Sequence, residues 1–73
     1  MKIIIESTEK IVELNGVPAR VWEGHTQSGI PVHCFITRVA VPQGENMEQF
    51  DRELRDCAAP SADVAAYPPR LAL

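Results

Sequence analysis

The sequence predicts an α+β fold in which an antiparallel sheet of about four strands carries one amphipathic helix on one face. Three observations predict it. The dipeptide Asn15-Gly16 separates two runs rich in β-branched and apolar residues, which is the strongest short-range signal for a β-hairpin. A long stretch of alternating side chains begins at Ile30. Apolar residues then recur at helical spacing between residues 46 and 58.

The Asn15-Gly16 turn sets the pairing of its two strands, because a type I′ turn takes positive φ at both central residues and these two types reach it most cheaply. On one face we expect the opposed pairs Leu14 with Val17, Val12 with Ala19, and Lys10 with Val21. On the other face we expect Ile11 opposite Arg20, and Trp22 near Glu9.

The remaining strands follow from alternation and from turn residues. Residues 2–6 predict a first strand, residues 9–14 a second strand or its continuation, and residues 17–24 the return arm of the hairpin. Residues 30–41 give the longest strand signal, which Pro42-Gln43-Gly44 ends. Pro18 cannot donate to a neighbouring strand, so we expect pairing with residues 38–41 to be interrupted there.

Residues 46–58 predict the helix. Asn46 can cap its N-terminus, with Gln49 three positions on, and Pro60 stops it. One stripe carries Met47, Phe50, Leu54 and Cys57, and charged residues fill the remainder. We expect this stripe to pack on the sheet face of Val12 and Val21, leaving the charged side to solvent.

The tail, residues 60–73, follows as a short helical turn and then an extended path imposed by Pro68-Pro69. Because it ends on apolar residues, we expect it to dock on its own sheet as an edge strand or on a neighbouring copy. The 73 residues form a single domain with a thin core, which favours a homo-oligomer. The candidate contacts between copies are Pro68, Leu71 and Leu73.

Composition narrows the function classes. The net charge is −3 and the basic residues are scattered, so nucleic acid is disfavoured as a partner. The apolar run at residues 3–5 is far too short to span a membrane. Two cysteines do not make a disulfide framework, and we expect a cytoplasmic protein. Cys34 and Cys57 fall at apolar positions, where they would be reduced core thiols or would form one disulfide with each other.

The sequence lacks the patterns of catalytic and metal sites. Two histidines and two cysteines could in principle bind zinc, but His33 and Cys34 are neighbours on a strand and point to opposite faces. We therefore expect no metal, no cofactor and no enzymatic activity, since no nucleophile and base are brought together and no glycine-rich phosphate loop is present.

The remaining candidate is a binding surface on the sheet face opposite the helix. We place Arg20, Trp22, His33, Phe35 and Thr37 there, with Arg38 beside them. Tryptophan and arginine are enriched at binding hot spots, so this face is a candidate interface. In the alternative interpretation Trp22 and Phe35 are covered by the tail or by a second layer.

The segments LNGVPARVWEG (residues 14–24) and GIPVHCFITR (residues 29–38) resemble small uncharacterised proteins of bacteriophages and prophages. The resemblance implies a compact product that binds and blocks a host protein, such as a defence component, as an inhibitor or adaptor. The contact would be made by the Trp22/Phe35 face or by the acidic helix. Two alternatives stay open. The chain could form an oligomer that sequesters a small anionic ligand such as a signalling nucleotide, with Trp22 or Phe35 stacking on a base and Arg20 or Arg38 pairing a phosphate, or it could be a structural phage component.

Overall fold

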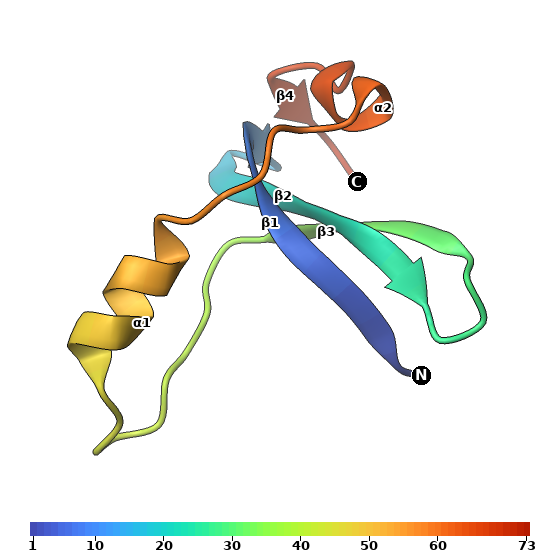
Figure 1. Cartoon of the computed structure of the whole chain (residues 1–73). Helices are drawn as coiled ribbons and strands as arrows, with labels where there is room; N and C mark the ends of the chain where they lie inside the picture. The colour runs from blue at the N-terminus through green and yellow to red at the C-terminus, as the bar shows by residue number, and fades with distance from the viewer.

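The computed structural model describes all 73 residues as a four-stranded mixed sheet with two short helices (Figure 1). The elements along the chain are β1 (Ile3–Leu14), β2 (Val17–Thr26), β3 (Pro31–Ile36), α1 (Met47–Leu54), α2 (Ala62–Ala65) and β4 (Arg70–Leu71). The strand order across the sheet is β3-β2-β1-β4. The predicted α+β class is confirmed. The prediction of one domain from 1 to 73, divided into a sheet region (1–41), a helix and a tail, stays a prediction.

The sequence predicts a wholly antiparallel sheet, and this part of the prediction is wrong because the sheet is mixed. β1 pairs antiparallel with β2, and β2 with β3, but β4 runs parallel to β1. The reason lies in the path of the chain. After α1 the chain reaches β1 at Thr8, where Ala58 forms a parallel bridge, and it then follows β1 in the same direction as far as Leu14. A strand that joins the edge from this end can only be parallel.

The hairpin forms around Asn15 and Gly16, whose φ angles are 49° and 85°. Three expected pairs are confirmed: Leu14 with Val17, Val12 with Ala19, and Ile11 with Arg20. Beyond them the register shifts between Ser7 and Ile11. The expected positions of Lys10 opposite Val21 and of Trp22 near Glu9 are therefore wrong, because Trp22 lies opposite Ser7. The two predicted segments, residues 2–6 and 9–14, form one strand that begins at Ile3 and contains this bulge, and Lys2 lies outside it.

Thr8 holds the bulge together. Its side chain is fully buried, and its hydroxyl donates to the carbonyl of Val21 at 2.6 Å while accepting from the backbone N–H of Lys10 at 3.2 Å. The carbonyl of Thr8 accepts from Nη1 of Arg20 at 2.7 Å. Backbone groups that the bulge removes from the ladder are thus satisfied by two side chains, as burial requires.

β3 is shorter than the predicted strand of residues 30–41. Its pairing with β2 runs from His25 opposite Pro31 to Arg20 opposite Ile36 and then stops. The next residue of β2 that faces β3 is Pro18, which has no N–H to offer. The expected limit on pairing is confirmed, and residues 37–41 leave the sheet for the same reason.

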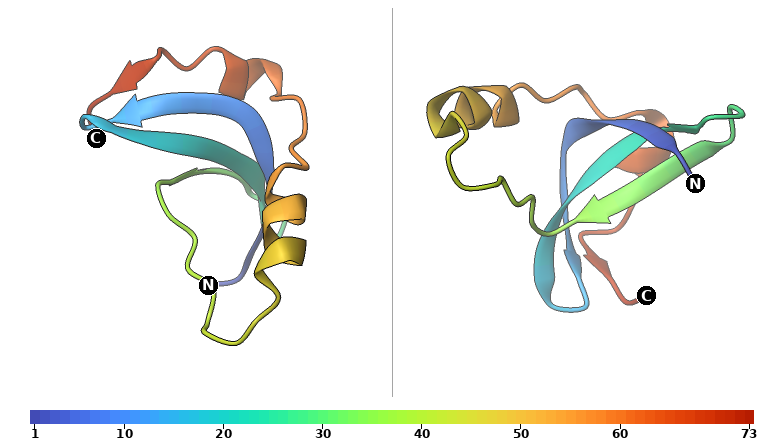
Figure 2. Two further views of the ribbon diagram at one scale, coloured as in Figure 1. Left: turned by 90° about the vertical axis from the view of Figure 1, so that its left-hand side faces the viewer. Right: turned by 90° about the horizontal axis from the view of Figure 1, so that it is seen from below.

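The core lies on one face of the sheet, which we call the tail face. Val12 and Val21 are buried there against Val64 of α2, and Phe35, Tyr67 and Leu71 pack around them. Ser61 caps α2 by accepting from the backbone N–H of Val64. Figure 2 shows the C-terminal segment on the convex side of the curved sheet and the loop before α1 on its concave side.

α1 stands away from the sheet at the end of two extended segments (Figure 1). Its predicted cap is confirmed, since Oδ1 of Asn46 accepts from the backbone N–H of Gln49 at 3.0 Å. The helix spans eight residues and not the predicted 46–58, so Cys57 lies outside it. No residue of α1 is buried, and α2 and the tail cover the tail face in its place. The expected packing of the α1 stripe on that face is therefore not confirmed.

The tail docks on its own sheet, as one of the two expected arrangements has it. The backbone N–H of Glu13 donates to the carbonyl of Pro69 at 2.7 Å, and that of Asn15 to the carbonyl of Leu71 at 2.8 Å. The Asn15 side chain then binds both backbone groups of Leu73.

Neither α1 nor α2 combines the length and the apolar character that crossing a bilayer demands.

Candidate functional site

A groove of about 260 Å³ lies on the open face of the sheet, which we define as the side of Ile11, Arg20, Trp22 and Ile36. One wall is this face of the sheet. The other is formed by the segment that leaves β3 and by α1, which contribute Val39, Phe50 and Leu54. The groove therefore separates the apolar stripe of α1 from the apolar residues of the sheet, which in an ordinary domain would touch each other.

Several of the lining residues are large, apolar and open to solvent. The exposed fractions of Ile11, Val39 and Leu54 are 53%, 47% and 40%. Met47, on the same helix, is 50% exposed. Exposed apolar side chains that line one groove make it a candidate surface for contact with a partner.

Trp22 lines the groove from the centre of β2. It lies opposite Ser7 on β1 and opposite Cys34 on β3, and its side chain is half-buried. Central strand positions are held by hydrogen bonds on both sides, so the indole is presented by a fixed backbone. This is the setting in which an aromatic anchor gives most to binding, because little freedom remains to be lost.

The charges at the groove are positive. Arg20 and Arg38 both line it, and no carboxylate does, although the whole chain has a net charge of −3. One nitrogen of Arg20 is held by the carbonyl of Thr8, which fixes the guanidinium over the bulge. Arg38 is exposed and makes no hydrogen bond or ion pair within the chain. The groove thus has one fixed and one free guanidinium.

The structure divides the six binding residues proposed from the sequence. Arg20, Trp22, Thr37 and Arg38 line the groove, whereas His33 and Phe35 lie on the tail face. Their placement beside Trp22 is therefore wrong. Phe35 lies opposite Val21, and in a sheet opposed residues share a face.

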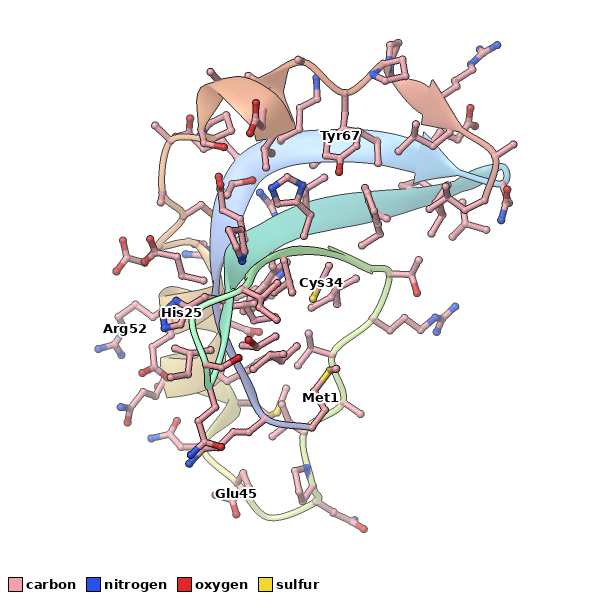
Figure 3. The ribbon with its side chains drawn as sticks, turned by 90° about the vertical axis from the view of Figure 1, so that its right-hand side faces the viewer. Met1, His25, Cys34, Glu45, Arg52 and Tyr67 are labelled. Carbon is pink, nitrogen blue, oxygen red and sulfur yellow. The ribbon has the colours of Figure 1, made fainter.

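His33 and Phe35 are occupied beneath the tail. Both rings meet the ring of Tyr67 edge to face, with centroids 5.5 Å and 5.3 Å away. Nδ1 of His33 and the hydroxyl of Tyr67 are 2.7 Å apart and share a hydrogen bond. Figure 3 shows Tyr67 and Cys34 on opposite sides of the sheet. The alternative interpretation, in which the tail covers aromatic residues, holds for Phe35 but not for Trp22.

The same contact region contains one carboxyl group with a shifted pKa. The backbone N–H of Ser61 donates to Oε2 of Glu23 at 2.8 Å. This bond lowers the pKa of Glu23 below its usual value, and the Ser61 hydroxyl and the neighbouring His33 act in the same direction. Because the hydrogen bonds stabilise the ionised form, Glu23 fastens the start of α2 to the sheet as a carboxylate.

The other candidate residues lie apart from the groove. Leu71 is half-buried against the core in β4, while Pro68 and Leu73 are exposed, so the proposed contact between copies through the tail stays a prediction. Cys34 and Cys57 are free thiols. No group of three or more histidine, cysteine, aspartate or glutamate residues is arranged to hold a metal ion.

Sequence reasoning missed the apolar walls of the groove. The one available signal was the hairpin register, which puts Ile11 opposite Arg20 and therefore on the same face as the proposed binding residues Arg20 and Trp22. The helical pattern predicts Phe50 and Leu54 for the core, whereas the structure places them in the lining of the groove. The chain matches none of the protein-family models, curated proteins or solved structures with which it was compared.

Proposed function

We propose that this chain is a small non-enzymatic binding protein that docks a segment of another protein in the open-face groove and acts as an inhibitor or adaptor. The observation that carries the proposal is the groove itself, which Trp22 lines together with exposed apolar side chains of the sheet, of the segment after β3 and of α1. Its polar side chains are guanidinium and hydroxyl groups, which suit recognition of a partner.

The composition of the groove specifies the partner's chemistry. Apolar side chains on the partner would cover Ile11, Val39 and Leu54, which are the exposed large apolar residues of the groove. A carboxylate would pair with Arg38, whose guanidinium has no partner within the chain. The segment that fits best is therefore amphipathic and acidic. In the setting that the resemblance to phage proteins implies, it would belong to a host protein that this chain blocks.

A second candidate ligand is favoured by one observation. Trp22, Arg20 and Arg38 line the same groove, so an aromatic surface and two guanidinium groups face one space. A nucleotide could stack on the indole and pair its phosphates with the arginines. The volume of about 260 Å³ lies slightly below the usual range for small-molecule pockets, and for this reason we rank a protein segment first.

Selection of peptides against the immobilised chain tests the proposal. A display library should enrich peptides that combine apolar and acidic residues. Trp22→Ala should reduce their affinity by at least about thirtyfold, the usual loss for a central interface tryptophan. Arg38→Glu should act selectively on acidic peptides, because it reverses the one free charge. Arg20 is unsuitable for this purpose, since its removal would also release the carbonyl of Thr8.

The matched control is Ile30→Ala. Ile30 is a large apolar residue with 61% exposure in the turn before β3, outside the groove. It should leave binding unchanged. Peptide binding that Ile30→Ala weakens and Trp22→Ala does not would refute the assignment of the groove. Titration with a nucleoside triphosphate and a cyclic dinucleotide in the same assay decides between the two ligand classes.

A further inference from the structure

β3 is an open edge strand. It is the last strand on one side of the sheet, and no segment of the chain pairs with its outer side. The opposite edge of the sheet is treated differently, because Ala58 covers β1 at Ser7 to Glu9 and β4 covers it at Glu13 to Asn15. The chain therefore protects much of one edge and none of the other.

The outward groups of β3 follow from the register. The backbone N–H of Thr26 donates to the carbonyl of Ile30, so the pairs that exchange hydrogen bonds with β2 are those of Val32, Cys34 and Ile36. The N–H and C=O groups of His33 and Phe35 then point away from the sheet. They are unpaired within the chain and are free to join another strand.

Devices that normally block an open edge are missing from this one. Such strands are usually short, bulged or furnished with lysine or an inward charge. β3 has six residues, Pro31 to Ile36, with no lysine, arginine, aspartate or glutamate and no bulge. Its only proline is the first residue, where it leaves the N–H groups of His33 and Phe35 unaffected.

The geometry points to a second copy of this chain, paired antiparallel along β3, as the occupant of this edge. The strand is complementary to itself about Cys34. In that register His33 of each copy exchanges its two main-chain bonds with Phe35 of the other, and Val32 meets Ile36 across the interface. Centring the pair on His33 would place Pro31 opposite Phe35 and lose a donor on each side, so the Cys34 register is the better one.

The chain exposes more surface than a folded protein of its mass usually does, which supports an interface with a second copy. A folded chain of 8.1 kDa is expected to expose about 4,500 Å², whereas this one exposes 5637 Å². The excess of roughly 1,100 Å² is of the order that each partner contributes to a stable interface, about 800 Å². The radius of gyration of 13.3 Å also exceeds the value of about 11 Å expected for a compact chain of this length.

The register makes a chemical prediction. Two Cys34 residues would face each other on the open face as a pair without main-chain bonds between them, with Cα atoms about 4.5 Å apart. The Cα atoms of disulfide-bonded cysteines are usually about 4.4–6.8 Å apart, so this separation is just sufficient for a disulfide. The Cys57→Ser variant, which retains only Cys34, should therefore form a disulfide-linked dimer when copper-phenanthroline is added as the oxidant that accepts the electrons of the two thiols.

The Cys34→Ser variant, which retains only Cys57, is the matched control and should stay uncrosslinked. Light scattering without oxidant should give twice the chain mass for the wild-type protein. Cys34→Lys, which sets two positive charges against each other at the two-fold axis, should give the single mass. Ile4→Lys makes the same type of change at an exposed position near the start of β1 and should leave the dimer intact.

Amide hydrogen exchange tests the interface without any substitution. The N–H groups of His33 and Phe35 should exchange more slowly as the protein concentration rises, because they are protected only in the dimer. A single mass at every concentration, a dimer that Cys34→Lys leaves unchanged, or crosslinking through Cys57 in place of Cys34 would overturn the inference. The groove on the open face is tested by Trp22→Ala, so a failure at one surface is distinguishable from a failure at the other.

Discussion

Replacing Thr8 with valine tests the bulge that gives β1 its register. Thr8 is fully buried and its hydroxyl makes two hydrogen bonds, one to the carbonyl of Val21 and one from the N–H of Lys10. Valine has nearly the same shape but can neither donate nor accept. The substitution therefore removes two bonds from the centre of the sheet while leaving the packing in place.

The expected cost follows from burial. A polar group left buried without a partner costs about 1–3 kcal/mol, and the carbonyl of Val21 belongs to a residue with no exposed surface. The N–H of Lys10 lies nearer to solvent and should cost less. We expect Thr8→Val to lower the free energy of unfolding by about 2–4 kcal/mol. A domain of this length is stable by only about 4–11 kcal/mol, so the effect is large.

Urea denaturation followed by tryptophan fluorescence measures this change, because Trp22 lies opposite the residue next to Thr8. Thr8→Ser is the matched control. It keeps both hydrogen bonds and removes one methyl group, which should cost about 1 kcal/mol. If Thr8→Val proves as stable as the wild-type protein, or less damaging than Thr8→Ser, the hydroxyl does not hold the bulge and the reasoning is refuted.

Two further predictions concern the core and the acid limb of stability. Val64→Ala should lower the free energy of unfolding by about 2 kcal/mol, whereas Phe50→Ala, on a helix with no buried residue, should cost less than about 1 kcal/mol in the same titration. A larger loss for Phe50→Ala would place α1 in the core. Glu23 has a pKa lowered from the ordinary value of 4.5, so its stabilising contribution is present above that pH and is lost as the pH falls through the folded-state pKa. Glu23→Gln should therefore be less stable than the wild-type protein at pH 7 in thermal melts, and the difference should shrink at pH 3; a constant difference would contradict the role of the carboxylate.

The hairpin was predictable because everything that determines it is local. Asn15 and Gly16 supply the positive φ angles, and the neighbouring residues pair outward from them. The bulge was not, since it depends on side chains from two strands. Thr8 carries no signal in its own segment, and its partners Arg20 and Val21 are twelve and thirteen residues away. A strand pattern reports which residues alternate but not where a buried hydroxyl replaces a ladder bond.

The faces of β3 were misassigned for a related reason. Side chains alternate with a period of two, so an error of one residue in the phase of a strand moves every side chain to the other face. The phase of β3 is set by the turn in which the N–H of Thr26 reaches the carbonyl of Ile30. This turn lacks the sequence signature that Asn15-Gly16 gives to the first hairpin, and His33 and Phe35 were placed on the wrong side as a result.

The choice between two amphipathic segments also lay beyond local sequence. The α1 stripe has the stronger helical pattern, yet the shorter α2 covers the core. What decides is the anchoring of the segments around α2. The N–H of Ser61 donates to Glu23, and the carbonyls of Pro69 and Leu71 accept from the N–H groups of Glu13 and Asn15, so the tail is fastened at both ends over the tail face. Such contacts between distant residues decide which face is filled.

The two surfaces that remain open are connected through β3. Its side chains on the open face include Ile36, which lines the groove, while the main chain of His33 and Phe35 forms the free edge. Antiparallel pairing about Cys34 would relate the two copies by an axis perpendicular to the sheet, so both open faces would lie on the same side of one continuous sheet. The two grooves would then be presented together to a single partner. A partner that binds both grooves at once would be held more tightly than by one groove, although neither groove makes any new contact. The open edge of β3 and the groove would then both contribute to binding in one assembly.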